Sequence, residues 1–171
     1  MTMTNLMTQI AISISEVMET MFYIPVEPRS CYTTLYESGL IPDSQLNSKA
    51  SSSNLNNIES AKITFHGIFS GEIVLIAQEN LLVIMTENFM GEERDNLTSE
   101  HIEGTLKEAL NMLAGNTFSK LDSQSSFGLG VPEINTSDIL QNDSKKNSYS
   151  KEPLIVIDTM DGIMGIITRI E

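Results

Sequence analysis

Apolar residues recur at helical spacing in three parts of the chain. The first predicted helix ends before Pro25, because proline lacks the backbone N–H that a helix interior needs. A second helix is predicted over residues 79–91. A third is predicted to start at Thr98 or Ser99, either of which can act as N-cap, and contains GTLKEALNMLAGNTFSKL at residues 104–121. The apolar face of the first helix consists of Ile10, Ile14, Val17, Met18, Met21 and Phe22.

Runs rich in β-branched and apolar residues lie between these helices. In AKITFHGIFSGEIVLIAQ two such runs flank Ser70-Gly71, and in PLIVIDTMDGIMGIITRI two flank Asp161-Gly162, so each segment predicts a hairpin. The segment FGLGVPEI predicts one more strand. Because hairpins favour antiparallel pairing, we expect an α/β (α+β) fold, in which long helices pack on one face of a mainly antiparallel sheet.

Two polar segments interrupt this pattern. Residues 45–60, QLNSKASSSNLNNIES, and residues 137–151 are rich in Ser, Asn, Lys and Asp and lack periodicity. Such segments bury little apolar surface, so we predict that both are solvated loops that the fold does not need. A chain of 171 residues can bury one sizeable core, and we expect residues 1–171 to form a single domain.

The net charge of -13 narrows the range of partners. Phosphate backbones and anionic membrane surfaces attract clustered Lys and Arg, so we expect neither nucleic acid nor membrane as a partner. No apolar run approaches the length of a membrane span, and the N-terminal segment lacks the early positive charge of a secretory signal. A single cysteine, Cys31, excludes an internal disulfide framework. We therefore expect a cytoplasmic protein.

The third predicted helix carries two lines of residues with different character. Its apolar stripe, which we expect to face the core, consists of Ile102, Leu106, Ala109, Leu110 and Leu113. Gly104, Glu108, Asn111 and Gly115 follow a second line at spacings of 4, 3 and 4, which points away from that stripe. An interior glycine destabilises a helix by about 1 kcal/mol relative to Ala. The glycines would leave a bare surface for another backbone, and the adjacent Met112 suits an adaptable contact.

Other interpretations of these residues stay open. A Glu and an Asn on an exposed helix face are ordinarily solvated, and Gly115 can simply admit a neighbouring strand. The two histidines, His66 and His101, lie far apart in the sequence, and with one cysteine they predict no zinc site. Signatures of serine hydrolases and phosphate-binding loops are absent from the sequence.

The segment EALNMLAGN at residues 108–116 resembles the signature helix of the CheC/CheX/FliY family of chemotaxis phosphatases. SEVMETMFYIPVEP, FHGIFSGEIVLIAQ, ENFMGEE and GLGVPEI occur in the order typical of that family, so the resemblance covers most of the chain. The first helix has Glu16 and Glu19 but no matching Asn, and a single E-x-x-N motif is more similar to CheX than to CheC.

The resemblance implies that the protein is a phosphatase for the aspartyl phosphate of a CheY-type response regulator. Asn111 would orient the attacking water, and Glu108 would pair with a lysine of the partner; Gly104, Met112 and Gly115 would contact the partner. It implies no cofactor of the protein's own, since Mg²⁺ is expected on the phosphorylated partner. Because this chain has Gly104 where the family often has Asp or Ser, a non-catalytic docking domain of the same fold remains the alternative.

The same resemblance implies a homodimer. CheX-like relatives dimerise through sheet edges, and the apolar strand GIMGIITRI has no Pro or Lys to block edge pairing. We therefore expect this segment to form the dimer edge.

Overall fold

The computed structural model of the protein describes residues 3–31, 35, 38–40, 58–121, 126–137 and 153–171. Within these residues the helices are α1 (Met3–Met21), α2 (Glu79–Met90) and α3 (Ser99–Leu121), with a short 3-10 helix, η2 (Arg94–Asn96). The strands are β1 (Arg29–Cys31), β2 (Ile58–His66), β3 (Gly71–Gln78), β4 (Gly128–Leu129), β5 (Glu133–Ile134), β6 (Leu154–Asp158) and β7 (Ile163–Ile170).

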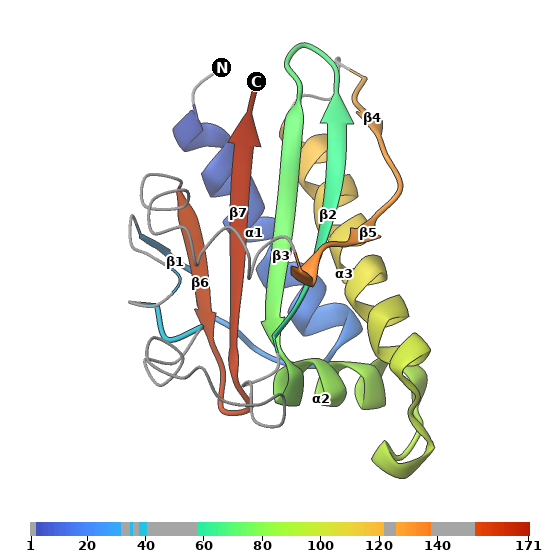
Figure 1. The fold of residues 1–171 in the computed structure, drawn as a ribbon. Helices are drawn as coiled ribbons and strands as arrows, with labels where there is room; N and C mark the ends of the chain where they lie inside the picture. Colours follow the sequence, from blue (N-terminus) through green and yellow to red (C-terminus); the bar gives the residue numbers. More distant parts are fainter. Residues whose placement is uncertain (1–2, 32–34, 36–37, 41–57, 122–125, 138–152) are drawn as a thin grey trace, which may run out of the picture.

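All the strands join one antiparallel sheet in the order β1-β6-β7-β3-β2-β4, and β5 also pairs with β2. The helices α1 and α3 lie behind this sheet as drawn, and α2 crosses its lower end (Figure 1). The predicted α+β class, with helices on one face of an antiparallel sheet, is confirmed.

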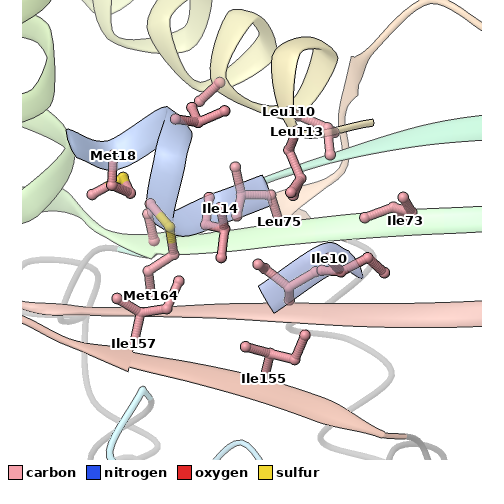
Figure 2. Packing of buried hydrophobic residues seen from close by; sticks show 14 of the residues in the cluster. Ile10, Ile14, Met18, Ile73, Leu75, Leu110, Leu113, Ile155, Ile157 and Met164 are labelled. Atoms are coloured by element: carbon pink, nitrogen blue, oxygen red, sulfur yellow. The ribbon is translucent and has the colours of Figure 1, made fainter. Parts of the chain in front are cut away.

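The alternation of side chains in β3 divides the buried residues into two groups. Ile73 and Leu75 belong to the main core, which joins the sheet to all three helices. The intervening Val74 and Ile76 belong to a smaller cluster on the opposite face, where Leu35 and Leu40 also pack. Figure 2 shows the main core, in which side chains from α1, α3, β3, β6 and β7 meet between the helices and the sheet.

The predicted helices are confirmed, with local reasons for their ends. Helix α1 stops before Pro25, where Tyr23 adopts a left-handed conformation with a φ of 57° and the Ile24 N–H donates to the Met18 carbonyl. Helix α2 ends at Gly91, whose φ of 68° suits glycine and whose N–H donates to the Glu87 carbonyl.

The prediction of a loop over residues 45–60 is wrong at its end. Residues 58–60 form the start of β2, where Ile58 and Ser60 are buried, while residues 45–57 lie outside the described part. The error arises because Ile58 is a single apolar residue after a long polar run. The second predicted loop, 137–151, lies outside the described residues except for the exposed Ser137.

The predicted strand FGLGVPEI is two short strands, β4 and β5, with residues 130–132 between them. Both strands pair with β2, β4 at Phe65 and His66 and β5 at Ala61 and Lys62. Proline cannot donate to a strand ladder, and Pro132 lies at the interruption.

The prediction that GIMGIITRI forms a dimer edge is wrong, because β7 lies inside the sheet. It pairs with β3 on one side and with β6 on the other, and residues 164–168 are buried. An apolar strand without Pro or Lys fits an interior strand as well as an unblocked edge. The described edges of the sheet carry the three-residue β1 and the two-residue β4 and β5, and short edge strands limit pairing with other chains.

Candidate functional site

Helix α3 presents one face to the core and the other to solvent. Its predicted stripe is confirmed: Leu106, Ala109, Leu110 and Leu113 are fully buried, and Ile102 packs against the same core. The stripe meets residues of α1 and β3, as Figure 2 shows for Leu110 and Leu113. This burial fixes the rotation of the helix, so residues on the opposite line must face outward.

A reciprocal cap holds the N-terminal end of α3. The Thr98 hydroxyl accepts from the backbone N–H of His101 at 3.3 Å, and Nδ1 of His101 accepts from the backbone N–H of Thr98 at 3.3 Å. This is a capping box in which histidine takes the place of the usual Glu or Gln. Of the two predicted caps, Thr98 is therefore the one that acts.

An aromatic cluster holds the C-terminal end of α3. The Phe118 ring stacks on Phe127 with centroids 4.6 Å apart and contacts Phe65 of β2 at 4.7 Å. Phe69 completes the cluster through edge contacts with Phe65 and Phe127. Two residues after Phe118, Lys120 forms an ion pair with Glu16 of α1. Contacts with the rest of the fold therefore hold α3 at its C-terminal end, and a capping box closes its N-terminal end.

Glu108 and Asn111 lie near the middle of α3, on its outward face. Both side chains are exposed, and their spacing of three residues makes them neighbours on the helix surface. Among the described residues neither has a hydrogen-bond or ion-pair partner, so both are available to another molecule. A carboxylate can only accept hydrogen bonds, whereas an Asn amide can both donate and accept. The pair can thus hold a cation and orient a water side by side.

Within the described structure, no neighbouring atom requires a glycine at the two glycine positions on this line. Gly104 is exposed and Gly115 half-buried, and a Cβ added at either would meet nothing within 4 Å. The alternative that Gly115 admits a neighbouring strand is therefore wrong. Met112, beside this line, is half-buried and packs against the core, so only part of it remains for a contact.

Other chemically active residues do not join this site in the described structure. His66 is exposed on β2, His101 serves the cap, and nothing is described of the Cys31 side chain. In the described part of the chain, no group of three or more His, Cys, Asp or Glu side chains could hold a metal ion. No helix among the described residues is long and apolar enough to cross a membrane.

The contacts that hold the two ends of α3 were not predicted from the sequence. The phenylalanines of the cluster lie between residues 65 and 127, and no local sequence pattern predicts that they meet. Their contacts depend on how β2 and β4 pair. The cap by His101 was also missed, although a Thr three residues before it could have suggested a variant capping box.

Solved structures of chemotaxis proteins share this fold. CheX from Vibrio vulnificus is 16% identical, with a TM-score of 0.66 over 97% of this chain and 96% of that one. The CheX of a CheX–CheY–BeF3–Mg²⁺ complex from Borrelia burgdorferi is 14% identical, with a TM-score of 0.66 over 97% of each chain. A CheC-like protein from a Shewanella species is 16% identical, with a TM-score of 0.63 over 100% of this chain and 99% of that one.

Sequence comparison gives the family directly. No curated protein sequence matches this chain significantly. The sequence model of the family described as "Chemotaxis phosphatase CheX" matches residues 60–157, which is more than half of the chain and includes all of α3. The chain therefore belongs to the CheX family of chemotaxis phosphatases.

Proposed function

We propose that this protein dephosphorylates the aspartyl phosphate of a CheY-type response regulator, using Glu108 and Asn111. The observation that carries the proposal is the exposure of both side chains, without partners among the described residues, on a helix anchored at both ends. Membership of the CheX family and the solved CheX–CheY complex of similar fold support the choice of partner.

Asn111 orients the attacking water in this proposal. The water oxygen forms a bond to phosphorus as the bond from phosphorus to the aspartyl oxygen breaks, which releases inorganic phosphate and a free carboxylate. Phosphoryl transfer has a loose transition state, so positioning and charge placement supply most of the catalysis. The Asn amide accepts from the water and donates to it or to a phosphoryl oxygen, but it has no useful pKa to act as a base.

Glu108 fixes the position of the partner. Its carboxylate pairs with a lysine beside the phosphate, which sets the register of Asn111 relative to the phosphorus atom. Charge pairs at an interface contribute to specificity and encounter rate. The protein supplies no cofactor in this proposal, and Mg²⁺ belongs to the phosphorylated regulator.

The test is the decay of a phosphorylated CheY-type regulator with and without this protein. We expect added protein to accelerate phosphate release at substoichiometric amounts. The alternative is a non-catalytic docking domain. Such a domain would bind the beryllofluoride-activated regulator and leave the decay rate of the phosphorylated regulator unchanged. The departure from the family pattern at Gly104 favours that alternative.

We also propose a homodimer, as the family resemblance implies. The interface cannot be an edge formed by β7, because both sides of β7 are paired. A monomer mass in light scattering at tens of micromolar would contradict the dimer.

A further inference from the structure

Three large apolar side chains are exposed where the C-terminal ends of α1 and α2 meet. Tyr23, just after α1, is 74% exposed, and Phe89 and Met90, the last two residues of α2, are 38% and 40% exposed. A hydrogen bond of 2.7 Å from Nδ2 of Asn88 to the Phe22 carbonyl joins the two helix ends. The Phe22 and Phe89 rings also meet, with centroids 5.7 Å apart. We call Tyr23, Phe89 and Met90 the corner patch.

The backbone of Tyr23 has a conformation that tyrosine rarely adopts. Its φ of 57° lies in the left-handed region, and no other non-glycine residue in the described part of the chain has a positive φ. The Ile24 N–H donates to the Met18 carbonyl, as in a Schellman motif, in which glycine is the usual left-handed residue. The Tyr23 side chain has no hydrogen bond or aromatic contact with another described residue. Strained residues of this kind cluster at binding sites and other functional positions.

Carboxylates flank the corner patch along the chain. Within four residues of Tyr23 or Met90 there are five of them, and Arg94 is the only cation in the same two stretches. The salt bridges among the described residues include none of the five, so their charges are available to another molecule. The five carboxylates are those of Glu19, Glu27, Glu87, Glu92 and Glu93.

The chemistry of the patch indicates the kind of partner. Aromatic and methionine side chains are typical of the centre of an interface, and complementary charges around that centre give specificity. An apolar patch beside unpaired carboxylates therefore complements a segment that presents apolar side chains together with Lys or Arg. A second copy of this chain would instead bring like charges together, and the net charge of -13 adds to that repulsion.

We propose that the corner patch binds a basic segment of another protein, whose apolar side chains pack on the patch while its Lys and Arg residues pair with the flanking carboxylates. The hydrogen bond between Asn88 and Phe22 holds the two helix ends together before binding, which reduces the entropy lost on association. The patch shares no residue with the pair Glu108 and Asn111, and the inference does not rest on the proposed function.

The probes are three short fluorescein-labelled peptides, followed by fluorescence anisotropy with the full chain. The first combines Lys with Leu and Phe at helical spacing, the second has Glu in place of Lys, and the third has Ser in place of Leu and Phe. We expect the first peptide to bind with a Kd on the order of 10 μM and the other two to bind much more weakly. Added salt should weaken the first peptide, because the carboxylates are near the surface.

A substitution at Tyr23 tests the apolar part of the patch. Tyr23→Gly removes the ring and suits the left-handed φ, so the variant should keep or raise Tm and bind the first peptide about 10-fold more weakly. Ile68→Ser is the matched control, because Ile68 is another exposed apolar residue, 61% exposed, in the turn between β2 and β3. It should leave the affinity for the peptide unchanged.

A pair of charge substitutions tests the acidic part. Glu92→Gln combined with Glu93→Gln should weaken the first peptide about 3- to 10-fold and reduce the effect of salt on its affinity. Glu133→Gln combined with Glu171→Gln removes the same charge from two other exposed positions and should have a clearly smaller effect. Equal effects of the two double variants would mean that only the net charge attracts the peptide, and the inference would be wrong.

Further outcomes would also overturn the inference. The first peptide can fail to bind, or bind Tyr23→Gly as tightly as wild type. A lower Tm of Tyr23→Gly would mean that the ring serves the fold. Loss of dimer mass in that variant by light scattering would assign the patch to a second copy. Weaker binding of the beryllofluoride-activated regulator would assign it to the regulator.

Discussion

Helices α1 and α3 pack against each other on the same face of the sheet, yet their outward residues differ. Each carries an acidic residue followed three positions later by a second polar one, Glu16 and Glu19 in α1 and Glu108 and Asn111 in α3. Glu16 is engaged by Lys120, and α1 contains no glycine. The pair in α3 has no partner among the described residues and is flanked by glycines.

This difference distinguishes a pair of polar residues that takes part in the fold from a similar pair that is available to another molecule. The exposed pair of Glu16 and Lys120 joins two helices and, being exposed, contributes about 0–1 kcal/mol. The line on α3 makes no such link to any described residue, and its two glycines are poor helix formers.

The largest expected effect is on the free energy of unfolding, and it compares a buried residue of α3 with an exposed one. Leu110→Ala should lower the free energy of unfolding by about 2–5 kcal/mol, because Leu110 is fully buried and its truncation leaves a cavity. The adjacent Asn111→Ala should change it by no more than about 0.5 kcal/mol, because the side chain is exposed. Urea unfolding of both variants gives the comparison. Equal losses would mean that Asn111 supports the fold.

The same two faces show what the sequence could predict. Helical spacing was sufficient to assign Leu106 and Leu110 to the core and Glu108 to solvent, because periodicity is a local property. The position of β7 was not predictable in this way. Its apolar pattern suits any strand with buried faces, and its place between β3 and β6 depends on pairing with distant residues.

The exposure of the candidate site residues was predictable from the sequence, but the supports of α3 were not. The E-x-x-N spacing and the family resemblance made Glu108 and Asn111 the candidates, and the structure confirms that both are exposed. The sequence could not decide whether Gly115 served packing, because that depends on which side chains the fold brings near it. The roles proposed for Glu108 and Asn111 remain predictions.

The next largest effect concerns docking. Glu108→Ala should weaken binding of the activated regulator by about 1–3 kcal/mol, because it removes the partner of a lysine beside the phosphate. Glu108→Lys should weaken it further by placing like charges together. Glu19→Lys makes the same charge change on α1, where Glu19 is also exposed, and should have little effect. Isothermal titration would contradict the account if the two lysine variants weakened binding equally.

A smaller effect is expected at the cap of α3. Thr98→Ala should lower the free energy of unfolding by about 1 kcal/mol, because it removes the acceptor for the His101 N–H. Thr98→Ser keeps the hydroxyl and should retain most of the stability. Thermal unfolding of both variants is the measurement, and equal losses in the two would show that the hydroxyl is not what stabilises the helix end.

The smallest effect tests whether α1 can replace α3. Glu19→Asn gives α1 its own E-x-x-N spacing, and in an Asn111→Ala background we expect it to restore no phosphatase activity. The reason is that Glu16 is engaged by Lys120 and that α1 lacks the flanking glycines. Recovery of phosphate release in this double variant would show that the motif alone is sufficient and that the surroundings of α3 do not matter.

The central claim is that Asn111 acts in the transition state, and single-turnover dephosphorylation tests it most directly. Phosphate release is followed at saturating protein for wild type and Asn111→Ala, alongside their affinities for the beryllofluoride-activated regulator. A well-placed hydrogen bond to a charged centre is worth roughly 2–4 kcal/mol, so the rate should fall about 30- to 1000-fold while the affinity stays near that of wild type. A wild-type rate in Asn111→Ala would contradict the account.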